Sequence, residues 1–396
     1  MMRSLKLGAA AMVVAAFLTA CGDDDEGGSD SNVDVQQSED CATRTQEARD
    51  AGELKEVSLQ LQWVSQAQFA GYYAAVAECY YVDEGLDVQI VEGGVDIVPQ
   101  DVLASGDVDY AISWVPKVLG SIEQGAGITN VAQIFERSAT TQISFKDKDI
   151  TTAADLAGHT VGSWGFGNEW ELFAGMQQAG VTLEDITLVQ QQFDMNAFLA
   201  GDIDAAQAMT YNEYAQVLES VNPDTGELYQ PEDLNVIDWN DVGTAMLQDA
   251  IWADAERLAD DEAYAETTVG FIKASIKGWI FARDNPEEAA TIVTEAGSTL
   301  GTSHQLWMTN EVNKLIWPST SGGVGMIDEE AWNQTVEIAM STENETGATI
   351  ISSDPPDTAY SNEYVEQALA ELEEEGEDVI GEDFTPIEVT LDEGGN

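Results

Sequence analysis

Four short segments of the sequence combine aromatic rings with amide, hydroxyl or carboxylate side chains. They lie around Trp63, Trp114, Trp164 and Tyr211, and each follows a run of residues that is expected to form a β-strand. Side chains that follow the carboxyl ends of strands gather where open α/β sheets bind ligands. Aromatic faces stack on flat rings, while amides and carboxylates hydrogen-bond to ring edges. These segments therefore predict a binding site for a small flat molecule.

The predicted ligand contacts come from all four segments: Trp63, Gln68, Phe69, Ser113, Trp114, Trp164, Gly165, Asn168, Glu169, Tyr211, Asn212 and Glu213. Some of them have a structural alternative. Trp63 suits a hydrophobic core equally well, and Asn168 and Glu169 suit the cap of the helix that follows them.

Lys117 is the only cation close to these segments. A sulfonate, nitrate or phosphate would normally meet an arginine or a cluster of free N–H donors. Arg137, Arg257 and Arg283 are expected on helices or on the surface. The segments therefore favour a nitrogen-rich ring that is neutral or weakly cationic.

The remaining reactive side chains do not form a catalytic set. His159 and His304 lie far apart without the spacing of metal ligands, so we expect no metal, no cofactor and no catalytic residue. Cys41 and Cys79 are expected to form a disulfide outside the cytoplasm, with two free thiols as the alternative.

The 396-residue chain carries 74 acidic and 14 basic residues, a formal net charge of −60. Nucleic acid is excluded as a partner, because phosphate binding needs a basic face. A hydrophobic fraction of 44% still supplies a core. The acidity indicates adaptation to a saline habitat, and the alternative is simple solubility.

The first residues predict export. Arg3 and Lys6 precede an apolar run at residues 7–18, which is too short to span a bilayer. The run ends in Leu-Thr-Ala-Cys, which resembles the bacterial lipobox, so residues 1–20 are expected to be a signal peptide and Cys21 the lipidated residue. The alternative is an ordinary signal peptide with a chance cysteine. Residues 21–55 are expected to form an acidic tether.

From residue 57 onward, expected strands and helices alternate, which predicts α/β sheets covered by helices. A second α/β unit begins near residue 143. After residue 246 the chain is expected to be mostly helical, with one helix break at Asn285 and Pro286.

The order of these motifs resembles the type II periplasmic binding fold, an α/β fold in which two lobes enclose a ligand cleft. The resemblance lies in LQWVSQAQFAGYYAA, GLDVQIVEGG, LASGDVDYAISW, ISFKDKDITTAADLAGHTVGSW and DNPEEAATIV. More narrowly, these motifs resemble the importer-associated proteins that bind thiamine pyrimidine precursors, sulfonate and nitrate. The resemblance implies one lobe from residues 56–142 and 248–345, a second from 143–247, and a C-terminal helix with an acidic tail at 346–396.

The same resemblance implies a solute-binding component of an ABC importer, monomeric and exported. It would be lipid-anchored to the outer face of the cytoplasmic membrane or lie in the periplasm, and it would deliver its ligand to a permease and its ATPase. In pyrimidine-binding relatives a carboxylate such as Glu213 would pair with a ring nitrogen and its amino group. Riboflavin-like or sulfonate ligands, a ligand-sensing lipoprotein and an enzyme of pyrimidine synthesis are the alternatives.

Overall fold

Two five-stranded sheets organise the chain in the computed structural model, which describes residues 32–396. The predicted signal peptide, lipobox and Cys21 lie outside the described residues. The strand orders are β2-β1-β3-β10-β4 and β7-β6-β8-β5-β9. The first sheet comprises β1 (Lys55–Gln60), β2 (Leu86–Val91), β3 (Tyr110–Trp114), β4 (Ile128–Gln133) and β10 (Asp249–Asp254). The second comprises β5 (Thr140–Phe145), β6 (Thr160–Ser163), β7 (Thr187–Gln190), β8 (Ala205–Met209) and β9 (Leu234–Asp238). The predicted α/β class is confirmed.

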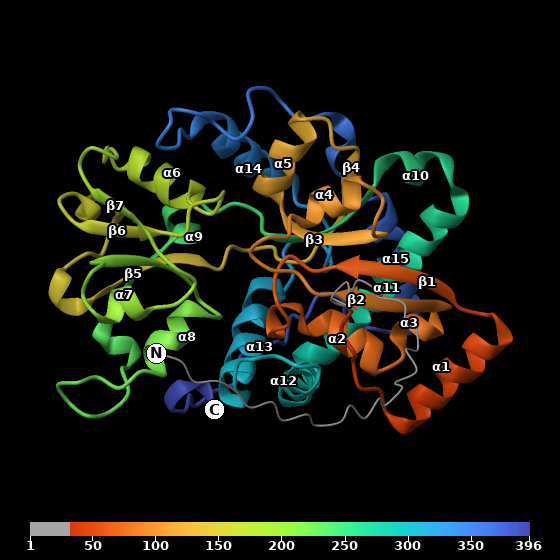
Figure 1. Ribbon diagram of the computed structural model, residues 1–396. Coiled ribbons are helices and arrows are strands. Elements are labelled where there is room, and N and C mark those ends of the chain that lie inside the picture. Colours follow the sequence, from red (N-terminus) through yellow and green to blue (C-terminus); the bar gives the residue numbers. More distant parts are fainter. Residues whose placement is uncertain (1–31) are drawn as a thin grey trace, which may run out of the picture. The chain divides into compact units, whose positions relative to one another are not determined.

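The first sheet is buried on both faces. β1 runs parallel to β2 and β3, and β10 is inserted antiparallel between β3 and β4. Alternate side chains of a strand face opposite sides of a sheet. Tyr110 and Ile112 therefore pack with α2 (Ala70–Ala77), α11 (Glu262–Asp284), α12 (Pro286–Glu295) and α13 (Thr302–Ile316). Ala111 faces the opposite layer of α4 (Pro99–Ala104), α5 (Val115–Glu123) and α14 (Glu329–Ser341) (Figure 1).

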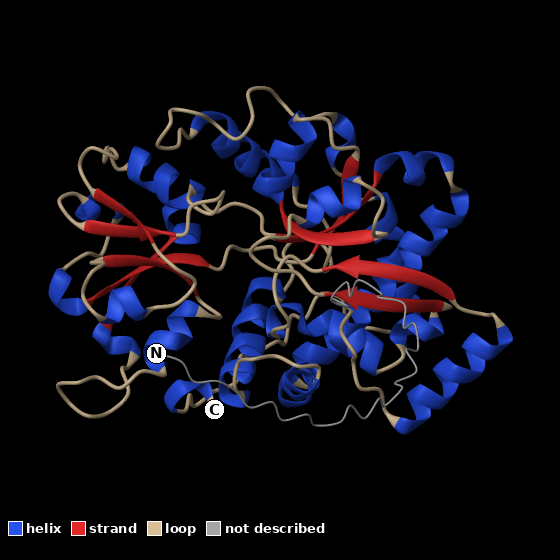
Figure 2. Cartoon of the chain, in the orientation of Figure 1, coloured by secondary structure: helices blue, strands red, loops and turns tan. Residues whose placement is uncertain are grey.

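The second sheet repeats this plan on a smaller scale, as Figure 2 shows. β5 lies antiparallel between β8 and β9, and β6 pairs in parallel with β7 and β8. Its helices are α6 (Trp170–Gln178), α7 (Asn196–Leu199), α8 (Glu213–Leu218) and α9 (Trp239–Val242). The sheet separates two apolar clusters, one built around Trp239 and the other around Phe198.

The predicted boundary between residues 142 and 143 falls inside β5, which already pairs with β8 from Thr140. The first crossing between the sheets therefore has to precede Thr140. The second crossing precedes β10, which begins at Asp249. The division into two lobes stays a proposal, with the end of the first segment of lobe one placed before Thr140 instead of at residue 142.

The helix break at Asn285 and Pro286 is confirmed, because α11 ends at Asp284 and α12 begins at Pro286. Proline fits the first turn of a helix, where its missing N–H leaves no bond unmade, but it interrupts a helix interior. The late helix α15 (Glu363–Glu375) packs against α11, and α10 (Ala255–Asp260) connects β10 to α11.

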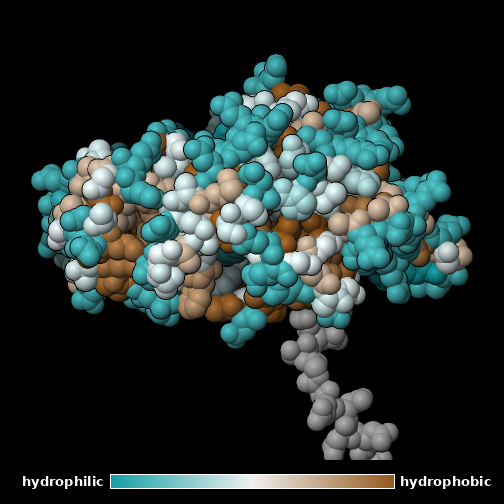
Figure 3. All heavy atoms as spheres, turned by 90° about the horizontal axis from the view of Figure 1, so that it is seen from above, coloured by the Kyte–Doolittle hydropathy of each residue, from teal (hydrophilic) through white to brown (hydrophobic). Residues whose placement is uncertain are grey.

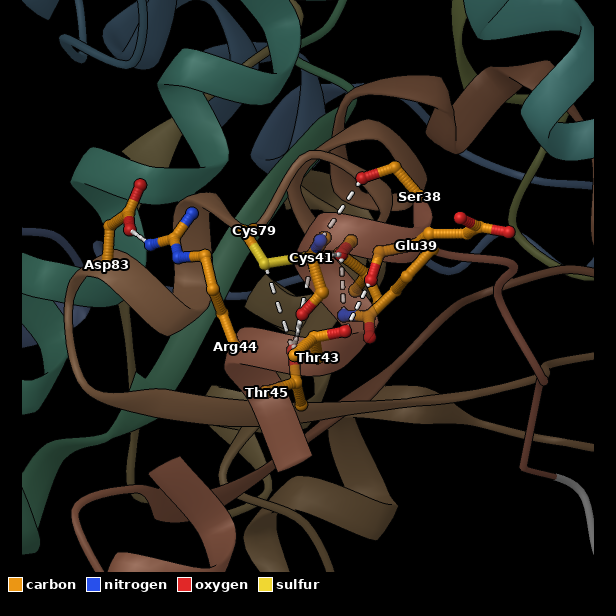
Figure 4. Close-up of a disulfide and its surroundings, with 10 residues drawn as sticks. Ser38, Glu39, Cys41, Thr43, Arg44, Thr45, Cys79 and Asp83 are labelled. Carbon is orange, nitrogen blue, oxygen red and sulfur yellow. Dashed lines mark hydrogen bonds and ion pairs between the residues drawn. A yellow bond between two sulfur atoms is a disulfide. The ribbon is translucent and has the colours of Figure 1, made fainter. Parts of the chain in front are cut away.

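The prediction of a tether as far as residue 55 is wrong, because α1 (Glu39–Ala51) occupies much of that range. Ser38 caps the start of α1, and Gly52 ends it in the left-handed conformation. Figure 4 shows how the disulfide between Cys41 and Cys79 holds α1 on the first sheet's helices. The disulfide expected from the cysteine pair is therefore present in the structure.

The segment FAGYYAAVAECYYVDEG does not form one continuous helix. The segment is divided into α2 and the short α3 (Tyr80–Asp83) at Cys79, which has a φ of 64°. A positive φ at a residue other than glycine cannot continue a right-handed helix.

The acidic C-terminal segment is packed against the protein. Its backbone donates from Ile387 to Asn310 Oδ1 and from Gly394 to the carbonyl of Glu219. Among residues 32–396, the helices are all too short or too polar to cross a bilayer.

Candidate ligand-binding cleft

A cavity of about 600 Å³ opens where the strand ends of both sheets meet. From the first sheet it receives residues that follow β1, residues 94–100 before and within α4, and the junction of β3 with α5. From the second it receives residues after β6 and β7 and the junction of β8 with α8. The cavity is thus built by several loops at once, which is the usual position of a ligand site in α/β proteins.

Most of the residues predicted from the sequence line this cavity: Trp63, Gln68, Ser113, Trp114, Trp164, Asn168, Tyr211, Asn212 and Glu213. Lys117, which was expected nearby, also lines it.

Three predicted contacts do not line the cavity. Phe69 is fully buried in the hydrophobic core of the first sheet, because it caps α2 against that core. Gly165 has a φ of 68° and serves the turn after β6. Glu169 stands at the N-cap position of α6, but its carboxylate accepts from the Gly167 N–H at 2.9 Å and makes no capping bond to the helix.

Aromatic rings from both sheets form the walls. Trp63 from the first sheet and Phe193 from the second are in contact, with ring centroids 4.8 Å apart, and Trp164 stacks beside Phe193 with centroids 6.2 Å apart. The indole N–H of Trp164 is buried without a hydrogen-bond partner among residues 32–396. Phe193 was missed in the sequence, although it follows β7 and the same strand-end rule applies to it.

Asp249 organises the wall on the side of the first sheet. Its carboxylate accepts from Gln62 Nε2 at 2.7 Å, Gln68 Nε2 at 3.0 Å and Trp114 Nε1 at 2.7 Å. Burial raises the pKa of Asp249 to about 7, and these donors together with Lys117 act against that rise. Asp249 thus fixes the orientation of two predicted contacts, Gln68 and Trp114. In the sequence, Asp249 is an acidic residue at the start of an apolar strand, and this is the signal that could have identified it.

Glu213 is the carboxyl group of the cavity on the other side. Its Oε2 accepts from the Met209 N–H at 3.1 Å, and its Oε1 accepts from Asn212 Nδ2 at 3.2 Å. Burial raises the pKa of Glu213 to about 7. Each carboxylate oxygen has two lone pairs, so both oxygens can accept one further bond from a ligand.

Lys117 supplies a cation over the face of the Trp114 ring, with Nζ 4.7 Å from the ring centroid. Burial lowers its pKa to about 8, and the charges of Asp249 and Glu169 act in the opposite direction. A single lysine whose pKa is lowered suits a ligand carbonyl or another single polar group better than a fully ionised oxyanion.

A second groove, of about 830 Å³, lies between α6 and α14. Its lining contains glutamine, glutamate and other polar side chains but no aromatic ring. Ligand sites are mostly apolar with a few convergent polar groups, so the aromatic cavity is the better candidate. Residues 32–396 contain no cluster of three or more histidine, cysteine, aspartate or glutamate side chains arranged to hold a metal ion.

The chain is similar in sequence to a protein family and to several named proteins. The family model described as NMT1/THI5 like matches residues 66–289. A formylaminopyrimidine-binding protein of Halalkalibacterium halodurans is 27% identical over 259 residues, which cover 64% of this chain and 73% of the relative. The riboflavin-binding protein RibY of Chloroflexus aurantiacus is 24% identical, over 79% of this chain and 86% of the relative.

Among solved structures, the periplasmic sulfonate-binding protein SsuA from Methylobacillus flagellatus KT superposes with a TM-score of 0.58. The match covers 86% of this chain and 99% of that protein, at 19% sequence identity. At this identity the likeness establishes the fold alone, and it confirms the predicted periplasmic binding fold.

Proposed function

This chain belongs to the NMT1/THI5-like family, and we propose that it is the extracytoplasmic solute-binding component of an ABC importer whose ligand is a flat nitrogen heterocycle. The observation that carries the proposal is a cavity walled by aromatic rings of both lobes, with the buried carboxyl group of Glu213 in its lining. The relatives reported above are named as binding proteins, which supports binding over catalysis.

An aminopyrimidine edge suits Glu213 well. One carboxyl oxygen accepts from the ring's amino group, and the other shares a proton with the adjacent ring nitrogen. A pKa of about 7 lets this carboxyl group hold or release that proton near neutral pH. Trp164 and Tyr211 supply faces on which the ring stacks, and the free indole N–H of Trp164 can donate to a ligand carbonyl.

A larger heterocycle of the riboflavin type is the second candidate, and the cavity volume favours it. At about 30 Å³ for each water molecule, 600 Å³ accommodates roughly 20 waters, which is more than a single pyrimidine ring fills. Sulfonates are the least suited class, because Lys117 is the only cation that residues 32–396 contribute to the cavity lining.

Delivery to a permease would follow binding, with the monomeric protein held at the membrane by lipid on Cys21. The lipobox-like sequence at residues 18–21 supports this anchor. The variant Cys21→Ser is expected to leave the membrane fraction or to accumulate as an unprocessed precursor. A variant that is processed and membrane-bound like the wild type would contradict the anchor.

A thermal-shift screen tests the proposed ligand class. The panel contains 4-amino-5-hydroxymethyl-2-methylpyrimidine, riboflavin and an aliphatic sulfonate, each in molar sodium chloride. A ligand at about 100 times its Kd should stabilise the protein by roughly 2.7 kcal/mol. Stabilisation by a heterocycle, and its loss in Trp164→Ala, is the expected result. Stabilisation by the sulfonate alone would overturn the proposal.

A further inference from the structure

His304 links α13 of the first lobe to α8 of the second. It is 1% exposed, and its two ring nitrogens contact side chains at the two ends of α8. Nδ1 lies 2.7 Å from Glu219 Oε1, and Nε2 lies 3.1 Å from Asn212 Oδ1. The sequence placed neither histidine in a cleft segment, yet His304 touches Asn212, which lines the cavity.

The neighbours of Asn212 allow one orientation of its amide. Gln216 Nε2 donates to its Oδ1 at 3.2 Å, and Glu213 Oε1 accepts from its Nδ2 at 3.2 Å. Oδ1 is therefore the acceptor that faces His304, so the imidazole carries a hydrogen on Nε2. The other ring nitrogen, Nδ1, lies within hydrogen-bonding distance of Glu219 Oε1, at 2.7 Å.

These contacts form one chain from Glu219 through His304 and Asn212 to Glu213. His304, Glu213 and Glu219 are each no more than 6% exposed, so water has little access to them. The C-terminal segment covers the Glu219 end, where the Gly394 N–H donates to the Glu219 carbonyl. Trp307 Nε1 donates to the Thr210 carbonyl at 3.0 Å, which fixes α13 against the start of α8.

We propose that His304 is a positioning residue for ligand recognition: it holds the Asn212 amide so that Nδ2 points at Glu213, and thereby directs the free lone pairs of Glu213 into the cavity. The proposal rests on the proposed function, since it assigns Glu213 to the ligand. It also makes recognition depend on the contact between the lobes, because His304 and Glu213 belong to different lobes.

A purely structural role explains this arrangement less well. Apolar side chains of similar size usually hold two buried surfaces together at least as stably as a buried charged pair does. A histidine between a carboxylate and an amide fixes hydrogen-bond directions, which an apolar contact does not.

Two substitutions of His304 separate the directions of its hydrogen bonds. In His304→Gln the amide nitrogen takes roughly the place of Nε2 and still donates to Asn212. In His304→Asn the amide nitrogen takes roughly the place of Nδ1, reaches Glu219 and leaves Asn212 without this donor. Both variants lose part of the buried chain, so loss of stability alone does not distinguish them. His159→Gln, at the partly exposed histidine near Asp204, is the matched control.

Calorimetry with 4-amino-5-hydroxymethyl-2-methylpyrimidine on the full chain is the first test. His304→Asn is expected to weaken binding about tenfold, whereas His304→Gln and His159→Gln stay within about threefold of the wild type. In a Glu213→Gln background, His304→Asn should add no further loss, because both changes remove the same interaction. Equal losses in the two His304 variants, or additive losses in the double variant, would overturn the proposal.

A ligand-free measurement separates this inference from the proposed function. If the wild type binds neither the pyrimidine nor riboflavin, the proposed ligand class fails, and a crystal structure of His304→Asn then decides the role of His304. Asn212 Nδ2 turned away from Glu213 supports the positioning role. An unchanged Asn212 and Glu213 would overturn it.

Discussion

At the scale of single residues, recognition depends on a carboxyl group that is already partly satisfied by the protein. Glu213 accepts from the Met209 N–H with one oxygen and from the Asn212 amide with the other. An amide nitrogen in place of either oxygen would face a donor. Glu213→Gln is therefore expected to weaken aminopyrimidine binding by about 1–3 kcal/mol, measured by calorimetry. Unchanged affinity would mean that Glu213 only stabilises the start of α8 and does not contact the ligand.

The pH dependence of binding gives an independent check on Glu213. Its pKa is raised to about 7 by burial, so the protonated carboxyl group is present below that pH and is lost above it. A ring that is neutral in solution then has no proton to share with the ionised carboxylate. Affinity should fall between pH 7 and pH 9 in the wild type and fall less in Glu213→Gln, which retains Lys117 and so controls for its titration. An equal fall in both proteins would refute the shared proton.

The residues after β1, β3, β6 and β8 could be predicted because a strand end is visible in a linear pattern. Asp249 and His304 could not, because their roles depend on side chains that are far away in the sequence, such as Trp114 and Asn212. Phe69 was misassigned because alternation does not distinguish a cavity wall from a core.

At the scale of elements, one helix holds both crossings between the sheets. Glu171 of α6 accepts from Ser138 Oγ at 2.8 Å, before β5, and from the Met246 N–H at 2.7 Å, before β10. Burial raises the pKa of Glu171 from 4.5 to about 8. Folding therefore favours the protonated form of Glu171. The folded protein is most stable, as far as this group is concerned, below pH 4.5, and this stability is lost as the pH rises from 4.5 through 8.

Glu171→Gln tests this contribution by urea unfolding at two pH values. At pH 5 the variant should be about as stable as the wild type, because a neutral carboxyl group and an amide each offer one donor and one acceptor oxygen, and the Ser138 hydroxyl can accept as well as donate. At pH 9 the variant should be more stable than the wild type by about 1–3 kcal/mol, because only the wild type then buries a charge. The exposed Glu373→Gln is the control, and a difference that is constant across the pH range would contradict this role of Glu171.

The helices from α11 to α14 followed their apolar periodicity and the proline break, so they could be predicted from local sequence. α1 could not, because a short polar helix such as this one is stabilised by tertiary contacts: the disulfide to Cys79 and the ion pairs Arg44–Asp83 and Arg49–Asp87.

At the scale of the whole molecule, acidic side chains dominate the surface. The net charge is −60, and hydrophilic residues cover most of the face shown in Figure 3, with apolar patches between them. Carboxylates crowded on one surface repel one another until salt screens them. The alternation of strands and helices and the order of the motifs predicted the two sheets. They did not predict that the acidic C-terminal segment packs against α8 and α13, because its composition alone indicated an unpacked tail.

Salt should therefore stabilise the folded protein. Raising sodium chloride from about 0.1 M to about 2 M is expected to raise Tm by about 5–10 °C, measured by circular dichroism. Sulfate salts are unsuitable, because they strengthen the burial of apolar surface independently of charge. A Tm that stays flat over this range would leave solubility as the explanation of the acidity.

One calorimetric comparison tests whether the cavity recognises the amino edge of a flat heterocycle. The wild-type protein is titrated in molar salt with 4-amino-5-hydroxymethyl-2-methylpyrimidine and with 5-hydroxymethyl-2-methylpyrimidine, which lacks only the amino group. Loss of one hydrogen bond to a buried carboxyl group should weaken binding of the second compound by about tenfold or more. Equal affinity for the two compounds, or no detectable binding of either, would contradict recognition of the amino edge by this cavity.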